Sequence, residues 1–136
     1  MFRILPENFF IPLSSPNKTV YWECICKLFS VMEQQLSFGV EREVLVDELQ
    51  YYFEQATAAE FIEEEFQASD SRGKANGILR RLEYYGWIEI ETDKSYVQRV
   101  NFKEYSVRLI KTLLEIEDGK QIEYQGYIYT IYSLVR

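Results

Sequence analysis

The clearest pattern of apolar and polar positions lies in residues 71–93, which read SRGKANGILRRLEYYGWIEIETD. The first half has apolar residues at the i, i+3, i+4 and i+7 spacing of a helix with one buried side. Gly86 follows where a helix end favours a residue that tolerates positive φ. Beyond it, Ile88 and Ile90 alternate with glutamates, as on a strand. The buried side of this helix is predicted to comprise Ala75, Ile78, Leu79, Leu82 and Tyr85.

A turn and a second strand are predicted to follow. Residues 93–95, Asp-Lys-Ser, can reverse the chain, and residues 96–102 read as a strand. The inner side of this strand is expected to hold Tyr96, Val100 and Phe102. A helix followed by such a hairpin is the second half of a winged helix-turn-helix. We therefore predict a mainly α (α+β) fold, with a winged helix-turn-helix, a two-stranded wing and flanking helices.

Other apolar stripes predict the flanking helices. One is expected after Pro16 and can end at Gly39, and a second begins near Glu41. A third piece can run from 57 to 66, and a fourth helix from 103 to 117, where Asp-Gly at 118–119 predicts a break. Its inward side is predicted to hold Tyr105, Leu109, Ile110, Leu113 and Ile116.

Length and composition predict one compact domain, since the chain has 136 residues of which 47% are hydrophobic. We expect a winged-helix domain over residues 1–119 with an apolar amino-terminal arm, which Pro6 and Pro12 keep from forming a full helix. Residues 120–136 are apolar around much of a helix and contain no stop signal. This segment is predicted to start a longer carboxyl-terminal helical region.

Charge is unevenly distributed along the chain. The net charge is −7, and residues 54–69 hold five acids and no base just before the basic helix. Exposed cations on that helix could contact DNA phosphates and guanine or the carboxylates of an acidic partner, or could be ordinary solvated groups. Gly77 is predicted to face outward, where a partner could approach closely. The candidate contacts with DNA or an acidic partner are Lys74, Arg80 and Arg81.

The composition offers no catalytic, cofactor or metal site. There is no histidine, which excludes imidazole ligands and histidine-activated nucleophiles. Cys24 and Cys26 lie two residues apart in a helical pattern, cannot pair with each other and suggest a reducing compartment. No apolar run reaches the roughly 20 residues needed to span a bilayer. We therefore predict a cytoplasmic protein that is neither an enzyme nor membrane-bound.

Three sequence blocks resemble one known family. They are LPENFFIPLSSPNKTVY near the start, SRGKANGILRRLEYYGWIEIE in the centre and YQGYIYTIYSLVR at the end. Together they are similar to the amino-terminal region of JetA, the MukF-like kleisin of the bacterial Wadjet anti-plasmid system. The resemblance implies a kleisin that bridges SMC-type ATPase heads in a condensin-like complex and self-associates through its amino-terminal domain. It also implies that the family's downstream regions are missing from this chain.

These observations predict a non-enzymatic interaction module of a condensin-like SMC complex that defends against plasmid DNA. Its expected partners are a second copy, an SMC-like ATPase and other subunits, and its contact with DNA is expected to be weak or indirect. The alternative is a stand-alone winged-helix DNA-binding transcriptional regulator. A homodimer is expected because two apolar terminal segments lie outside the winged-helix unit, and the alternative is that both segments fold back onto their own domain as extra core. Its candidate contacts are Phe9, Phe10, Tyr127 and Ile131.

Overall fold

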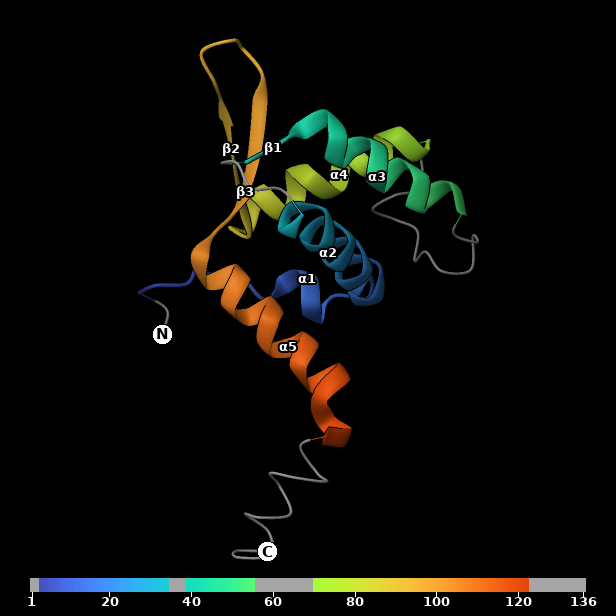
Figure 1. Cartoon of the computed structure of the whole chain (residues 1–136), viewed down its shortest axis with the longest axis vertical. Helices are drawn as coiled ribbons and strands as arrows, with labels where there is room; N and C mark the ends of the chain where they lie inside the picture. Colours follow the sequence, from blue (N-terminus) through green and yellow to red (C-terminus); the bar gives the residue numbers. More distant parts are fainter. Residues whose placement is uncertain (1–2, 35–38, 56–69, 123–136) are drawn as a thin grey trace, which may run out of the picture. The chain divides into compact units, whose positions relative to one another are not determined.

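The structure, a computed structural model, describes residues 3–34, 39–55 and 70–122. The chain divides into two compact units, Met1–Lys103 and Glu104–Arg136. In the first unit a one-turn helix α1 precedes three longer helices and three short strands (Figure 1). The elements are α1 Ile11–Ser14, α2 Lys18–Glu33, β1 Val40–Glu41, α3 Arg42–Gln55, α4 Ser71–Tyr84, β2 Ile88–Thr92 and β3 Gln98–Phe102.

From α2 onward, the order helix, strand, helix, helix, hairpin is that of a winged helix, as predicted. The sheet, however, has three antiparallel strands in the order β1-β3-β2, where the sequence predicted two. Val40 of β1 pairs with Val100, and Ile90 of β2 pairs with the same residue from the other side. A two-residue strand has no periodicity of its own, so β1 could not be recognised from the pattern.

The core of the first unit lies between α2, α3, α4 and the base of the sheet. The predicted stripes are buried in all three helices, although Tyr85 is only half-buried and α2 ends at Glu33, short of Gly39. Burying such side chains removes apolar surface from water at about 25 cal/mol per Å², which is the main contribution holding the helices together. Fully buried side chains include Tyr21, Ile25, Leu28, Leu45, Leu49, Ile78, Leu79, Leu82 and Trp87.

The end of α4 confirms the predicted helix stop. Gly86 has φ +86, its N–H donates to the Glu83 carbonyl (3.1 Å), and the Trp87 N–H donates to the Leu82 carbonyl (2.8 Å). This pair of hydrogen bonds satisfies carbonyls that the helix end would otherwise leave without donors. Gly86 therefore redirects the chain from α4 into β2.

The amino-terminal arm, residues 3–10, packs on this junction. A Cβ on Gly86 would lie 2.3 Å from Pro6 Cγ, so the proline ring occupies the space that a side chain would need. The Phe9 ring stacks on the Trp87 indole with 4.3 Å between centroids, and Trp87 Nε1 donates to the Phe9 carbonyl at 2.7 Å. Phe9 of the arm is thus part of the core of the first unit.

Two further predictions from the sequence need correction. Tyr96 was placed on the inner side of the second strand, but it lies in the turn before β3, with φ +65 and 89% of its surface exposed. In the second unit α5, Glu104–Ile122, continues through the predicted break at Asp118 and Gly119. A single glycine costs a helix only about 1 kcal/mol, so it does not have to end one.

One residue of α5 also differs from the prediction, since Ile116 was expected to face inward but is 59% exposed. Other predicted elements fall partly or wholly outside the residues that the structure describes. The third piece at 57–66 and the segment from 123 to 136 lie outside the described residues. The division of the chain at residue 119 stays a prediction.

Candidate interaction surface

Helix α4 carries the predicted contact residues. Asp70 begins it, because its Oδ1 accepts a hydrogen bond from the Gly73 N–H at 2.8 Å. Arg80 is exposed, whereas Lys74 and Arg81 are half-buried. Lys74 and Arg81 are two helical turns apart and lie on the same side of α4. That these three residues contact DNA or an acidic partner stays a prediction.

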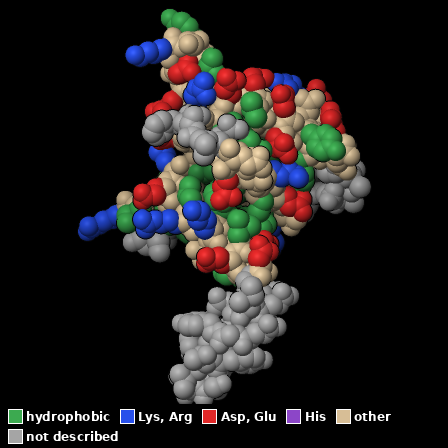
Figure 2. All heavy atoms as spheres, viewed as in Figure 1, with side chains coloured by type: hydrophobic (Ala, Val, Ile, Leu, Met, Phe, Trp, Pro, Cys, Tyr) green, Lys and Arg blue, Asp and Glu red, His purple; other side chains and the backbone are tan. Residues whose placement is uncertain are grey.

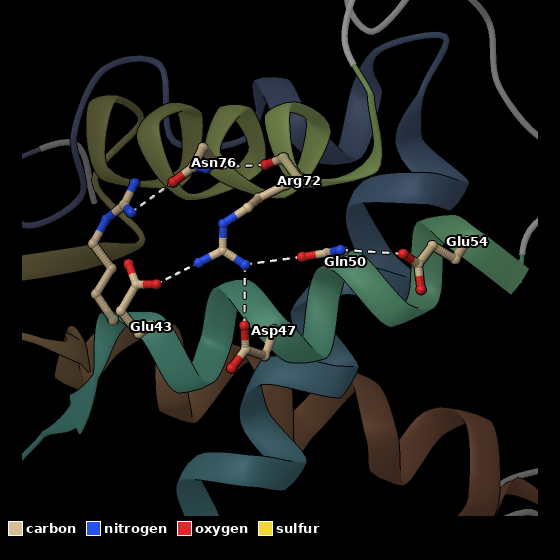
Figure 3. Close-up of polar contacts among 7 residues, drawn as sticks. Glu43, Asp47, Gln50, Glu54, Arg72 and Asn76 are labelled. Atoms are coloured by element: carbon tan, nitrogen blue, oxygen red, sulfur yellow. Dashed lines mark hydrogen bonds and ion pairs between the residues drawn. The ribbon is translucent and has the colours of Figure 1, made fainter.

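Arg72, at the start of α4, was not among the candidate residues, yet it is the centre of the polar contacts between α3 and α4 (Figure 3). Its Nη1 lies 3.1 Å from Asp47 Oδ1 and 2.9 Å from Gln50 Oε1, and its Nη2 pairs with Glu43. The hydrogen bond with Asp47 and the charges of both acids raise the pKa of Arg72. Its charge is therefore neutralised within the chain.

A hydrogen bond between Arg42 and Asn76 also joins α3 and α4. Arg42 Nη1 donates to Asn76 Oδ1 at 2.6 Å, and Asn76 Nδ2 donates to the Arg72 carbonyl at 3.0 Å (Figure 3). The Arg42–Asn76 contact spans 34 residues of sequence and the Arg72–Asp47 contact spans 25, so no local periodicity indicates either of them. The available signal was the Glu43 and Asp47 spacing of four residues, which places two carboxylates on one side of α3.

Gly77 does not face outward as predicted, since it is buried. A Cβ at this position would lie 2.9 Å from Arg81 Nη1 and 3.9 Å from Arg80 Nη2. The Arg81 side chain therefore covers Gly77, so an arginine of the same helix forms the surface at this position. Close approach by a partner at Gly77 stays a prediction.

Two cations at the hairpin, Arg99 and Lys103, are also held by carboxylates of the same unit. Arg99 Nε lies 2.9 Å from Asp93 Oδ2, and its Nη2 lies 3.8 Å from Glu41. Lys103 Nζ lies 3.0 Å from Glu89 Oε1. Figure 2 shows acidic and basic side chains interspersed over the visible face of the molecule. The pairs at Arg99 and Lys103 reduce the clustered positive charge of the hairpin, and phosphate binding requires such charge.

The predicted dimer contacts are distributed between the surface and the core. Phe10 is 41% exposed at the end of the arm, next to Ile11 of α1, which is 39% exposed. Phe9 has no exposed surface, so in this chain it is a core residue stacked on Trp87 and offers no surface to a partner. Tyr127 and Ile131 lie outside the described residues. The dimer interface stays a prediction.

No group of three potential metal ligands occurs among the residues that the structure describes. Cys24 and Cys26 are not joined in a disulfide, and burial raises the pKa of Cys24 well above its ordinary range, which favours the unreactive neutral thiol. In the described part of the chain, none of the helices combines the length and apolar character that crossing a membrane requires.

Comparison with known proteins gives the family. The family model "Wadjet protein JetA" matches residues 27–136. A Wadjet protein JetA of Bacillus cereus (strain Q1) is 32% identical to this chain over an alignment of 142 positions. The alignment covers 99% of this chain and 30% of that protein. No solved structure matches. These matches do not favour the stand-alone regulator. The chain spans about a third of the length of this relative. The two matches show that the chain belongs to the JetA family.

Proposed function

We propose that this chain is the winged-helix interaction module of a kleisin-type JetA subunit, in a condensin-like SMC complex that acts against plasmid DNA. Its role is non-enzymatic. Its partners are a second copy of the chain, an SMC-like ATPase and other subunits of the complex, and any contact with DNA is weak. Family membership supports a component of a Wadjet system.

The observation that carries the proposal is the internal pairing of Arg72 and Arg99 with carboxylates. Arg72 is bound by Glu43 and Asp47, and the hairpin's Arg99 is bound by Asp93 and Glu41. A DNA-binding protein gains affinity by releasing counterions when its cations neutralise phosphates. Cations already paired with carboxylates contribute less to this gain. A protein partner is therefore favoured over a duplex.

Fluorescence anisotropy with a labelled duplex tests the DNA part. At about 150 mM salt we expect binding no tighter than about 10⁻⁶ M, with little change in the double variant Arg80→Glu, Arg81→Glu. The matched control is Arg3→Glu with Lys18→Glu, which changes the charge equally at exposed positions outside α4. A tight, sequence-selective complex that only the α4 variant destroys would establish the regulator instead.

Sedimentation equilibrium tests self-association. The chain has a mass of 16.3 kDa, and we expect a dimer that Phe10→Asp or Ile131→Asp disperses. The control is Val44→Asp, which changes an α3 side chain of nearly equal exposure, 42% against 41% for Phe10. Circular dichroism must show that each variant is folded. A single 16.3 kDa species at every concentration would contradict the dimer.

A further inference from the structure

The tip of the wing holds an aromatic side chain in an unusual conformation. The hairpin of β2 and β3 projects away from the helices of the first unit, with its turn at the far end (Figure 1). In this turn Tyr96 has φ +65 and is 89% exposed. A bulky residue with positive φ is uncommon, because its Cβ crowds the neighbouring carbonyl oxygen.

The turn is held rigid by Asp93. Its Oδ1 accepts hydrogen bonds from the Ser95 N–H at 2.8 Å and the Val97 N–H at 3.0 Å, and its Oδ2 accepts one from Arg99 Nε at 2.9 Å. The Tyr96 N–H donates to the Asp93 carbonyl at 2.9 Å. The backbone is thus fixed independently of the Tyr96 ring, so the ring is not needed to form the turn.

Tyrosine at this position therefore destabilises the first unit without any compensating burial. Glycine or asparagine would accept the same φ with less strain. Strained residues that the surrounding structure holds in place cluster at sites of function. Tyrosine is also enriched among the residues that dominate binding energy, and a residue whose backbone is already fixed by hydrogen bonds loses less freedom on binding.

We propose that Tyr96 is an anchor that inserts into an apolar pocket on a protein partner, and that the exposed Lys94 pairs with carboxylates at the rim of this pocket. The proposal rests on the proposed function, because it assumes that the chain is an interaction module. Charge favours a protein over nucleic acid. Arg99 is paired with Asp93 and Glu41, so the hairpin offers little of the clustered positive charge that phosphate binding requires.

Site-specific photo-crosslinking tests the proposal in the full-length protein, co-expressed with the other Wadjet subunits. The crosslinker p-benzoylphenylalanine replaces Tyr96, and in the control it replaces Tyr51, a tyrosine of α3 that is 61% exposed. We expect position 96 to crosslink to one peptide of one subunit, with acidic residues beside the crosslinked site. Position 51 is expected not to crosslink to that peptide.

Affinity for the crosslinked subunit is then measured with purified proteins. We expect Tyr96→Asn to weaken binding by at least about tenfold while leaving the fold at least as stable as the wild type, and Lys94→Glu to weaken it as well. Tyr51→Ala should leave the affinity unchanged. The expected loss therefore cannot be attributed to unfolding.

Several outcomes would overturn the anchor. They are a crosslink from position 96 to nucleic acid, no crosslink at all, or a folded Tyr96→Asn variant that binds with wild-type affinity. If the wild-type chain assembles with the Wadjet subunits while Tyr96→Asn has no effect, the anchor is wrong and the proposed function stands. If the wild-type chain does not assemble with them, the proposed function fails together with the anchor.

Discussion

The hairpin after α4 has a residue with positive φ at its base and another at its tip, and their surroundings are opposite. Gly86 at the base lies under the Pro6 ring, beside the buried stack of Phe9 on Trp87. Tyr96 at the tip is 89% exposed. At the base the backbone conformation is matched by the residue and by the packing around it. At the tip, tyrosine is a residue type that disfavours positive φ. This indicates that the stability of the fold does not account for the tyrosine at position 96.

The largest expected change in the free energy of unfolding comes from removing the buried stack at the base of the hairpin. Trp87→Ala removes the ring on which Phe9 stacks and the donor to the Phe9 carbonyl, so it should lower the free energy of unfolding by about 3–5 kcal/mol. Urea denaturation followed by circular dichroism measures this loss. Tyr84→Ala, at a position that is 77% exposed, should change it by less than about 0.5 kcal/mol. Equal losses would mean that the arm does not pack on Trp87.

A comparison of two glycines sharpens the argument about conformation. Gly86→Ala introduces a side chain at φ +86 and 2.3 Å from Pro6 Cγ, so it should lower the free energy of unfolding by about 2–4 kcal/mol. Gly77→Ala should instead raise it by about 0.5–1 kcal/mol, because alanine favours the helix and the mobile Arg81 guanidinium can move aside.

Thermal denaturation of both alanine variants checks the opposite signs. A double-mutant cycle with Pro6→Gly then separates the contact from the backbone strain at Gly86, because only the contact couples the two positions. The same sign of change at both glycines would contradict the positive φ assigned to Gly86.

The tip should respond in the opposite direction to the base. Tyr96→Asn relieves the strain at φ +65 without removing a buried contact, so it should raise the free energy of unfolding by up to about 1 kcal/mol. Differential scanning calorimetry measures the accompanying rise in Tm. Lys94→Asn, an exposed neighbour in the same turn, serves as the control and should change Tm little. A clear fall in Tm of Tyr96→Asn would show that the ring stabilises the fold.

The smallest effect concerns pH. Hydrogen bonds from Val97, Arg99 and Ser95 lower the pKa of Asp93 below its ordinary value of about 3.9. A depressed folded-state pKa contributes stability above the unfolded value, and this stability is lost as pH falls through the folded value. Below about pH 4 the wing turn should therefore loosen, which a lower protection factor of the Val97 amide, its exchange rate compared with the intrinsic rate at the same pH, would report. Asp93→Asn should remove this pH dependence.

The sequence predicted the parts of the fold that follow from local periodicity. Three such parts are present in the structure: the apolar stripe of α4, the helix stop at Gly86, and the strand in which Ile88 and Ile90 alternate with glutamates. Each depends only on residues close together in the sequence. β1 is too short to show a pattern, and the turn at Tyr96 depends on hydrogen bonds to Asp93. These features arise from the tertiary structure, which periodicity does not report.

The candidate surface was less predictable than the fold. The charge of α4 alone indicated the candidates Lys74, Arg80 and Arg81. The role of a cation on this helix also depends on which side chains of the neighbouring helix lie within reach of it. Arg72 belongs to the same basic stretch and is bound to Glu43 and Asp47 on α3. Phe9 and Phe10 are neighbours of identical chemistry, yet one is stacked on Trp87 and the other is 41% exposed. Only the packing of distant segments separates such residues.

The arm's contact with Trp87 also constrains the order of events during synthesis. Phe9 and Trp87 are separated by 78 positions, and a ribosome adds about 5–20 residues per second. The arm is therefore made roughly 4–16 s before its binding site exists. Over this interval Phe9 and Phe10 are unprotected apolar side chains on a nascent chain, and they are natural targets for chaperones. We expect the arm to become ordered only after α4 and Trp87 have been made.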